Sequence, residues 1–388
     1  EKALKAAIEQ KKTLYIPVGE FKINKKIHLT ADGLTVTGAG MWYSKLNFTT
    51  NQKGQGGFEI GHDSNRLTFS NFAMTSALTS RYDHLDDKAQ YKAFAGSFGK
   101  DSRIDHMWIE HFECGAWIGD YDTKMKYTDH LVIENSRIRN NLADGVNFTQ
   151  GTRNSVVRNS NIRNNGDDSL ATFSSSIHTK EYASNNSFEH NTIELGWRAG
   201  GVGIFGGKNH KVTNNLIKDS RGGAGIRVST VFANEGFGLG FDDNNEILIK
   251  DNMIVNSGTT NDFYWPHSKP RSNIDFEETF GPIKGITVQN NVFVNPVYTD
   301  EAITHAGVEL DGKVKIIDSK VQGNTSSDPY KVDASMSHSV ENGKEVYNFT
   351  YGNQPTFLPE NSTAFERDYN YRGEREVDGH ILRFWEHK

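Results

Sequence analysis

The sequence predicts an all-β fold, a right-handed parallel β-helix with an N-terminal capping helix and long loop insertions. The main observation is a motif in which Asn or Asp follows one apolar residue by two positions and precedes another by three. Its copies are Phe69-Asn71-Met74, Ile133-Asn135-Ile138, Val157-Asn159-Ile162, Val212-Asn214-Ile217, Ile249-Asp251-Ile254, Val288-Asn290-Phe293 and Ile316-Asp318-Val321, and Phe188-His190-Ile193 fits with His replacing Asn. Short β-branched runs bounded by Asn, Gly and Asp turns make these repeats strands rather than helices.

The spacing of the motif is the second observation. From Ile138 onward, its last apolar position recurs after 24, 31, 24, 37, 39 and 28 residues. A base period in the mid-twenties, interrupted by insertions, is typical of a solenoid. Asn side chains stacked at one turn position can form hydrogen-bonded ladders, which would explain why Asn recurs. The continuous repeat predicts one elongated domain over residues 1–325 rather than several compact domains.

The composition agrees with a long, thin core. Among 388 residues, 35% are hydrophobic, and the chain has 37 Gly but only 8 Pro. That apolar fraction suffices for a narrow coil, and the excess of Gly and Asn is turn chemistry.

The N-terminal end is predicted to be capped. Residues 1–12 place Leu4, Ala7 and Ile8 on one face of an amphipathic helix, which suits it to cover the open end of the coil. The first rung is expected over residues 14–21. Because the chain opens inside this helix, we expect the true N-terminus to be missing.

The remaining segments are loops and an extension. Insertions are predicted near residues 77–100, 174–186, 229–246 and 256–281, where they could wall a groove. Residues 326–388 lose the repeat and are expected to form an irregular C-terminal extension packed on or capping the coil. A closing strand is predicted near residues 381–384.

Several classes of protein are disfavoured. A net charge of −6 and a pI near 6.2 give no support for nucleic-acid binding. No apolar run is long enough to span a bilayer, and no phosphate-binding loop or zinc-ligand spacing is present. The single cysteine, Cys114, rules out a disulfide framework and is interpreted as a small buried hydrophobe.

Three aspartates are predicted to meet at one point of the coil. Asp144 follows Ile138 by six residues, and Asp168 follows the aligned Ile162 by six. They should therefore stack on adjacent rungs roughly 4.8 Å apart, with Asp167 beside them. Such a patch cannot ionise fully, and acid/base cleavage of a glycosidic bond is the commonest use of clustered acids. The alternative is that these are turn aspartates that bind backbone or Ca²⁺.

The strand after the acids supplies candidate binding residues. If Val146 and its equivalents point inward, Asn147, Ala171, Gly203 and Arg227 form one outward row. Glycines in this row could leave space for a sugar ring against the backbone. The candidate substrate-binding residues are Asn147, His178, Trp197, Arg198 and Arg227. Tyr264 and Trp265 are further aromatic candidates, and 242–246 is an acidic loop that could hold Ca²⁺, although a solvated loop is the favoured interpretation.

These residues resemble known families. Asp144-Gly145, Asp167-Asp168, Gly201-Val202-Gly203 and Arg227-Val228-Ser229 follow the order of the polygalacturonase pattern, except that Val202 replaces its His and Ser229 its Lys. The resemblance is closer to the bacterial α-1,3-glucanases (mutanases) and mycodextranases of glycoside hydrolase family 87. It rests on Gly38-Ala39-Gly40-Met41-Trp42-Tyr43, Met107-Trp108-Ile109-Glu110-His111, Ala143-Asp144-Gly145-Val146-Asn147-Phe148, Asn164-Asn165-Gly166-Asp167-Asp168-Ser169-Leu170-Ala171 and Val202-Gly203-Ile204-Phe205-Gly206-Gly207.

The family resemblance implies a secreted bacterial endo-hydrolase that inverts the anomeric centre. It implies that Asp144, Asp167 and Asp168 are catalytic, with Asp167 as the general acid and the other two holding the water. No cofactor is implied beyond a possible structural Ca²⁺, and a monomer acting on a polysaccharide is expected. Two other classes stay open: a hydrolase of an anionic polysaccharide on the same fold, and a non-catalytic glycan-binding β-helix.

Overall fold

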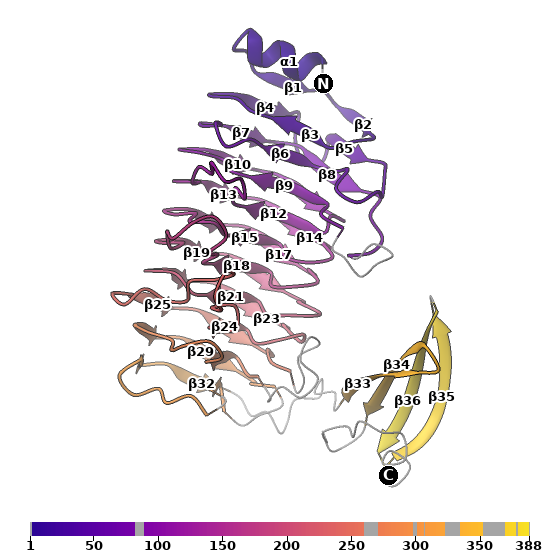
Figure 1. Ribbon diagram of the computed structural model, residues 1–388, viewed down its shortest axis with the longest axis vertical. Helices are drawn as coiled ribbons and strands as arrows, with labels where there is room; N and C mark the ends of the chain where they lie inside the picture. The colour runs from indigo at the N-terminus through magenta and orange to yellow at the C-terminus, as the bar shows by residue number, and fades with distance from the viewer. Residues whose placement is uncertain are drawn as a thin grey trace.

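The chain folds into a coil of three parallel sheets, and the fold prediction is confirmed (Figure 1). The structure, a computed structural model, describes residues 2–81, 89–259, 271–297, 301–305, 307–322, 334–351, 369–377 and 379–387. Each turn of the coil gives one strand to each sheet, and neighbouring strands come from successive turns. This is a right-handed parallel β-helix.

The strands of the three sheets are short. Sheet A contains β1 (Leu14–Ile16), β4 (Thr35–Gly38), β7 (Thr68–Ser70), β10 (Arg103–Asp105), β13 (Val132–Glu134), β16 (Val156–Arg158), β19 (Ser187–Glu189), β22 (Lys211–Thr213), β25 (Ile247–Lys250), β28 (Ile286–Gln289) and β31 (Val314–Ile317). Sheet B contains β2 (Gly19–Ile23), β5 (Ser44–Phe48), β8 (Ala73–Ser76), β11 (Trp108–Glu110), β14 (Arg137–Arg139), β17 (Asn161–Arg163), β20 (Thr192–Glu194), β23 (Leu216–Lys218), β26 (Met253–Val255), β29 (Val292–Val294) and β32 (Lys320–Gln322). Sheet C contains β3 (Ile27–Leu29), β6 (Phe58–Ile60), β9 (Lys92–Gly96), β12 (Cys114–Ile118), β15 (Val146–Phe148), β18 (Leu170–Phe173), β21 (Val202–Phe205), β24 (Ile226–Ser229), β27 (Ile274–Glu277) and β30 (Ile303–Thr304).

The register of sheet B confirms the repeat. The last apolar residues of the motif pair directly from rung to rung, in the order Met74, Ile109, Ile138, Ile162, Ile193, Ile217, Ile254, Phe293 and Val321. Ile109 belongs to the same row but lies in a copy of the motif with His in place of Asn.

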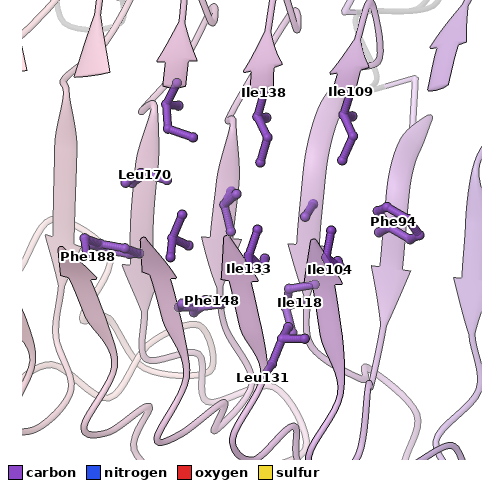
Figure 2. Packing of buried hydrophobic residues seen from close by; sticks show 14 of the residues in the cluster. Phe94, Ile104, Ile109, Ile118, Leu131, Ile133, Ile138, Phe148, Leu170 and Phe188 are labelled. Atoms are coloured by element: carbon purple, nitrogen blue, oxygen red, sulfur yellow. The ribbon is translucent and has the colours of Figure 1, made fainter. Parts of the chain in front are cut away.

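The core is a column of side chains inside the coil. Ile138, Leu170, Phe148 and Phe188 belong to one continuous buried cluster and point toward the coil interior from different sheets (Figure 2). Burying an Ile, Leu or Phe side chain stabilises a fold by roughly 1.5–3 kcal/mol. Every rung contributes such side chains, so the stabilisation accumulates along the coil. Cys114 is buried as predicted, and burial raises the pKa of its thiol well above the usual range.

The recurring Asn of the motif has a different role from the one predicted. Asn135, Asn159 and Asn214 adopt the left-handed conformation, with φ of 51°, 50° and 57°. Asn tolerates this conformation better than other non-glycine residues, which explains its recurrence. The buried side-chain ladder is formed instead by the next position along the chain, through Ser136, Ser160, Asn191, Asn215, Asn252, Asn291 and Ser319.

The N-terminal cap is present. Helix α1 (Lys2–Glu9) buries Leu4 and Ala7 against the same core cluster, and it lies across the N-terminal end of the coil (Figure 1). The first strand begins at Leu14, where the first rung was predicted.

Two of the predicted insertions are partly wrong. Residues 77–100 contain β9 and residues 256–281 contain β27, and both strands belong to sheet C. The motif marks only the step from sheet A to sheet B, so it does not indicate where a strand of sheet C lies within a long insertion. The stretches 174–186 and 230–246 do lie between strands of successive sheets, and Ser229 of the predicted insertion 229–246 still belongs to β24. Tyr264 and Trp265 lie outside the described residues.

The C-terminal residues that the structure describes are not irregular, which corrects the prediction for them. They form a four-stranded sheet of β33 (Ala334–Glu341), β34 (Lys344–Tyr351), β35 (Tyr369–Val377) and β36 (His380–His387). The predicted closing strand lies inside β36, and its partners are β34 and β35. In the described residues, no helix has the length and hydropathy to cross a membrane.

Candidate active site

Two successive turns of the coil bring the three aspartates together. Asp144 lies between β14 and β15, and Asp167 and Asp168 lie one rung later, between β17 and β18. Ile138 pairs with Ile162 before the turns and Val146 with Leu170 after them, so the turns are in register. One oxygen of each carboxylate lies within 4.8 Å of the others, as the stacking prediction requires.

A buried amide ladder holds these turns in place. Asn165 accepts two hydrogen bonds through its side-chain oxygen, and both come from Asn141. The backbone N–H of Asn141 donates at 3.2 Å and the side-chain amide of Asn141 at 3.0 Å. The side-chain amide of Asn165 in turn donates to the carbonyl of Ile138 at 3.3 Å. Both asparagines are buried, so the loop shape is fixed from beneath the acids.

Burial strongly perturbs the protonation of Asp168. It is buried and accepts a 2.9 Å hydrogen bond from the Gly200 N–H. Burial raises the pKa of Asp168 well above its usual range, and the carboxylates of Asp167 and Asp144 raise it further, whereas Arg227 and the Gly200 N–H act in the opposite direction. The aspartate trio therefore retains a proton at a pH where an ordinary aspartate has lost it.

Arg81 is a site residue that the sequence did not indicate. Its guanidinium lies 2.5 Å from a carboxylate oxygen of Asp167, and the side chain is only 9% exposed. Arg81 lies between β8 and β9, far from the aspartates in the sequence and in no repeated motif, so no sequence signal could have found it. A buried ion pair of this kind offsets one negative charge of the trio.

Asn147 and Trp197 lie beside the trio. The Asn147 amide donates to Asp144 at 3.3 Å. The Trp197 side chain packs directly against Gly166, the residue before Asp167, and Trp197 is 52% exposed. Trp197 thus presents a flat apolar face next to the acids.

The predicted outward row is also in register. Asn147 pairs with Ala171, Ala171 with Gly203 and Gly203 with Arg227. A Cβ atom at Gly203 would lie 2.7 Å from a carboxylate oxygen of Asp168. The absence of a side chain at Gly203 is therefore what lets the Asp168 carboxylate lie against the strand.

Arg227 is close to the trio but already has an anionic partner. Its Nε donates to Glu277 at 3.1 Å, and the Ser229 hydroxyl donates to the same oxygen at 3.1 Å. Arg271 adds a third contact to Glu277 at 3.3 Å. Arg227 lowers the pKa of Asp168 through this proximity while remaining mostly buried.

The two remaining candidates differ in exposure. Arg198 is buried, and its backbone packs closely against Gly222. His178 is an exposed turn residue with a φ of 61°, and none of the contacts of the trio described above involves it.

The acidic loop predicted as a possible Ca²⁺ site is engaged by lysines. Asp242 lies 3.2 Å from Lys208, and Asp243 forms an ion pair with Lys284. Among the described residues, the trio is the acidic group whose oxygens lie close enough together for a cation. The proton that the trio retains and the Arg81 guanidinium already offset part of the negative charge of the trio in the absence of a bound cation.

Comparison with protein families gives one match. Residues 1–317 match the family model described as α-1,3-glucanase catalytic domain D2. No curated protein matches this chain.

Solved structures provide further matches. The Agl-KA catalytic domain is 37% identical, with a TM-score of 0.69, over 83% of this chain and 64% of that one. A GH87 α-1,3-glucanase domain in complex with tetrasaccharides is 24% identical, with a TM-score of 0.67, over 81% of this chain and 56% of that one. The catalytic unit of a thermostable GH87 α-1,3-glucanase from Streptomyces thermodiastaticus strain HF3-3 is 24% identical, with a TM-score of 0.60, over 84% and 67%. This chain thus spans less than two thirds of the length of the first two.

Three of the GH87 structures carry alanine in place of a single aspartate and hold nigerose or tetrasaccharides. By their residue numbers, the replaced aspartates are an adjacent pair and a third position 23 residues before the pair.

Proposed function

Because this chain belongs to the α-1,3-glucanase catalytic domains of glycoside hydrolase family 87, we propose that it hydrolyses α-1,3-glucan or a closely related α-glucan with Asp144, Asp167 and Asp168. The observation that carries the proposal is the convergence of these three carboxylates within 4.8 Å on two adjacent rungs. Their spacing in the sequence, 23 residues and then one, equals that of the aspartates replaced in the GH87 structures.

The proposed mechanism inverts the anomeric centre in a single displacement. Asp167 donates the proton that the trio shares to the glycosidic oxygen as the bond from that oxygen to C1 breaks, and Arg81 pairs with the carboxylate that remains. A water attacks C1 from the opposite face and transfers one proton to the pair formed by Asp144 and Asp168. The products are two shorter chains, and the proton on the aspartate pair returns to Asp167 through solvent.

The geometry of the trio suits a bound water. Acid and base in inverting enzymes usually lie roughly 6.5–9.5 Å apart, across the bond and the water. The oxygens of the trio lie closer, within 4.8 Å. A water that donates to two oxygens at about 2.8 Å each can bridge that separation, so two carboxylates on one side can grip the attacking water.

Charge compensation favours a neutral substrate. Arg81 is paired with Asp167, and Arg227 with Glu277, so these two positive charges near the trio already face protein carboxylates. The half-exposed ring of Trp197 offers an apolar face to a sugar ring instead. A hydrolase of an anionic polysaccharide would need these arginines for its substrate. We also propose that the enzyme is secreted, because an insoluble glucan lies outside the cell. We further propose that it acts as a monomer.

The proposal is tested by replacing each aspartate with asparagine and measuring new reducing ends from α-1,3-glucan. All three variants should lose at least about 100-fold in kcat, because each group is used in the displacement. Near wild-type rates in all three would exclude hydrolysis at this site. Proton NMR of the nascent reducing end should show the β-anomer first, and an initial α-anomer would exclude the single displacement.

A fluoride leaving group separates the roles of the aspartates. Fluoride departs without protonation, so Asp167→Asn should hydrolyse an α-1,3-gluco-oligosaccharyl fluoride nearly as fast as wild type, whereas Asp144→Asn and Asp168→Asn should not. Rescue of Asp168→Asn instead would make Asp168 the general acid, in line with its raised pKa.

A further inference from the structure

Two tryptophans from separate segments meet on the outer surface, on rungs that precede those of the trio. Trp42 lies between β4 and β5, and Trp108 begins β11, two rungs later in sheet B. Their ring centroids are 4.7 Å apart in an edge-to-face arrangement. The register partner of Trp108 on β8 is Ala73, whose small side chain leaves room beside the Trp108 ring. Trp42 is 64% exposed, which is unusual for so large an apolar side chain.

The pair is held rigidly. The guanidinium of Arg137 lies 5.1 Å from the centre of the Trp42 ring and 5.0 Å from that of Trp108. The Trp108 indole N–H donates to Glu110 at 3.0 Å. These contacts fix the rings while leaving most of Trp42 open to solvent, so a ligand that stacks on it loses little side-chain entropy.

A line of hydrogen bonds joins this pair to the turns that carry the trio. Glu110 also accepts a bond from the Asn140 amide at 3.2 Å, and Asn140 accepts one from Asn164 at 2.9 Å. Asn140 and Asn164 stand in the two turns that carry Asp144 and Asp167. The tryptophan pair and the turns of the trio are therefore linked by amides and a carboxylate, groups that hydrogen-bond sugar hydroxyls.

We propose that Trp42 and Trp108 form an accessory binding platform for a neutral α-glucan chain, distinct from the residues at the bond that is cleaved. A flat, rigid aromatic face beside hydrogen-bonding amides matches the chemistry of a glucose ring, which has apolar faces and a polar rim. Because this line of polar side chains runs from the platform to the turns of the trio, one polymer can contact both. The choice of glucan as the occupant rests on the proposed function.

The test measures adsorption of Asp167→Asn protein to insoluble α-1,3-glucan, with and without Trp42→Ala. Removing the exposed ring should weaken adsorption on the order of tenfold, as expected for the loss of one stacked aromatic contact. In the active protein, Trp42→Ala should slow hydrolysis of the insoluble polymer more than that of a short soluble oligosaccharide. The control is Tyr15→Ala, because Tyr15 is similarly exposed, at 57%, but lies on β1 of sheet A.

The outcomes separate the platform from the proposed function. Unchanged adsorption by Trp42→Ala, while the parent protein still hydrolyses α-1,3-glucan, would overturn the platform and leave the function intact. Adsorption that depends on Trp42 without any hydrolysis of this glucan would overturn the function and leave the platform intact. Equal weakening by Tyr15→Ala, or a change of oligomeric state on removing Trp42, would also overturn the platform.

Discussion

Arg81 sets the charge balance of the aspartate trio at the scale of single residues. Three carboxylates within 4.8 Å repel one another, and burial raises the cost of ionising Asp168. The Arg81 guanidinium, 2.5 Å from Asp167, supplies a positive charge next to the trio. Protonation of the site therefore depends on a residue outside the repeat.

Replacing Arg81 should shift the pH dependence of the reaction. In Arg81→Gln the negative charges of the trio are less compensated, so the pKa of the group that must ionise to accept a proton from water rises. We expect the acidic limb of the kcat/KM profile to move to higher pH by about one unit, with kcat reduced at least about tenfold.

The matched control for this prediction is Arg81→Lys, which keeps the charge but loses the planar fork. It should retain most of the wild-type pH profile even if kcat falls. An acidic limb that stays in place in Arg81→Gln would show that Arg81 acts only in packing.

Only the site residues that belong to the repeat could be predicted from the sequence. Asp144 and Asp168 could be stacked from the sequence because each follows an aligned isoleucine by the same number of residues. Arg81 and the Glu277 partner of Arg227 could not, because their positions depend on loops and on rungs distant in the chain. The repeat therefore predicts acids in register but not the cations that neutralise them.

The turn ladders stabilise the coil at the scale of its elements. The motif Asn and the residue after it look alike in the sequence, yet Asn214 supplies a left-handed backbone and Asn215 a buried bridge between rungs. Sequence reasoning expected the ladder at the motif position, because it cannot tell which of two adjacent asparagines points inward.

A pair of substitutions should distinguish these roles. Asn215→Ala removes two bonds from Asn191 and two donated to Phe188 and Asn252. We expect the free energy of unfolding to fall by about 3 kcal/mol, measured by urea denaturation, since buried donors lose their partners. Asn214→Gly, which keeps the left-handed turn, should change it by less than about 1 kcal/mol. Equal effects at both positions would contradict this division.

A second ladder contains a histidine that should make the fold sensitive to acid. His210 accepts a hydrogen bond from the Asn186 N–H at 3.3 Å. The Asn186 side chain in turn accepts a bond from the Ser155 N–H of the preceding rung, so the two bonds form successive steps of one ladder. Burial lowers the pKa of His210 to about 4. The unfolded chain, with a histidine pKa near 6.5, therefore binds a proton that the folded state excludes at intermediate pH.

The sign of the pH dependence follows from that difference. The stability contributed by neutral His210 is complete above about pH 6.5 and is lost as the pH falls toward 4, amounting to about 3 kcal/mol. His210→Asn continues the ladder without a titrating group, so its unfolding free energy should fall less over this interval. Parallel pH profiles for the two proteins, measured by urea denaturation, would refute the assignment.

The position of the trio along the whole coil bears on how a polymer is cut. In sheet C the aspartates precede β15 and β18, the fifth and sixth of ten strands in the described residues. Several rungs therefore lie on each side of the trio along the coil axis (Figure 1). Such a side-on site differs from a pocket that accepts only a chain end.

This placement predicts internal cleavage of long glucan chains. A chain that lies along the outside of the coil can place any of its bonds at the trio, so early products should be oligosaccharides of many lengths. Size analysis of the products during the first few per cent of hydrolysis should show this spread, with a rapid fall in mean polymer length. As a control, blocking the reducing ends of the substrate by reduction should leave the rate unchanged, since no end is recognised. Release of a single short product from the start, with the polymer length otherwise preserved, would instead mean that loops close one side of the site and that the enzyme works from a chain end.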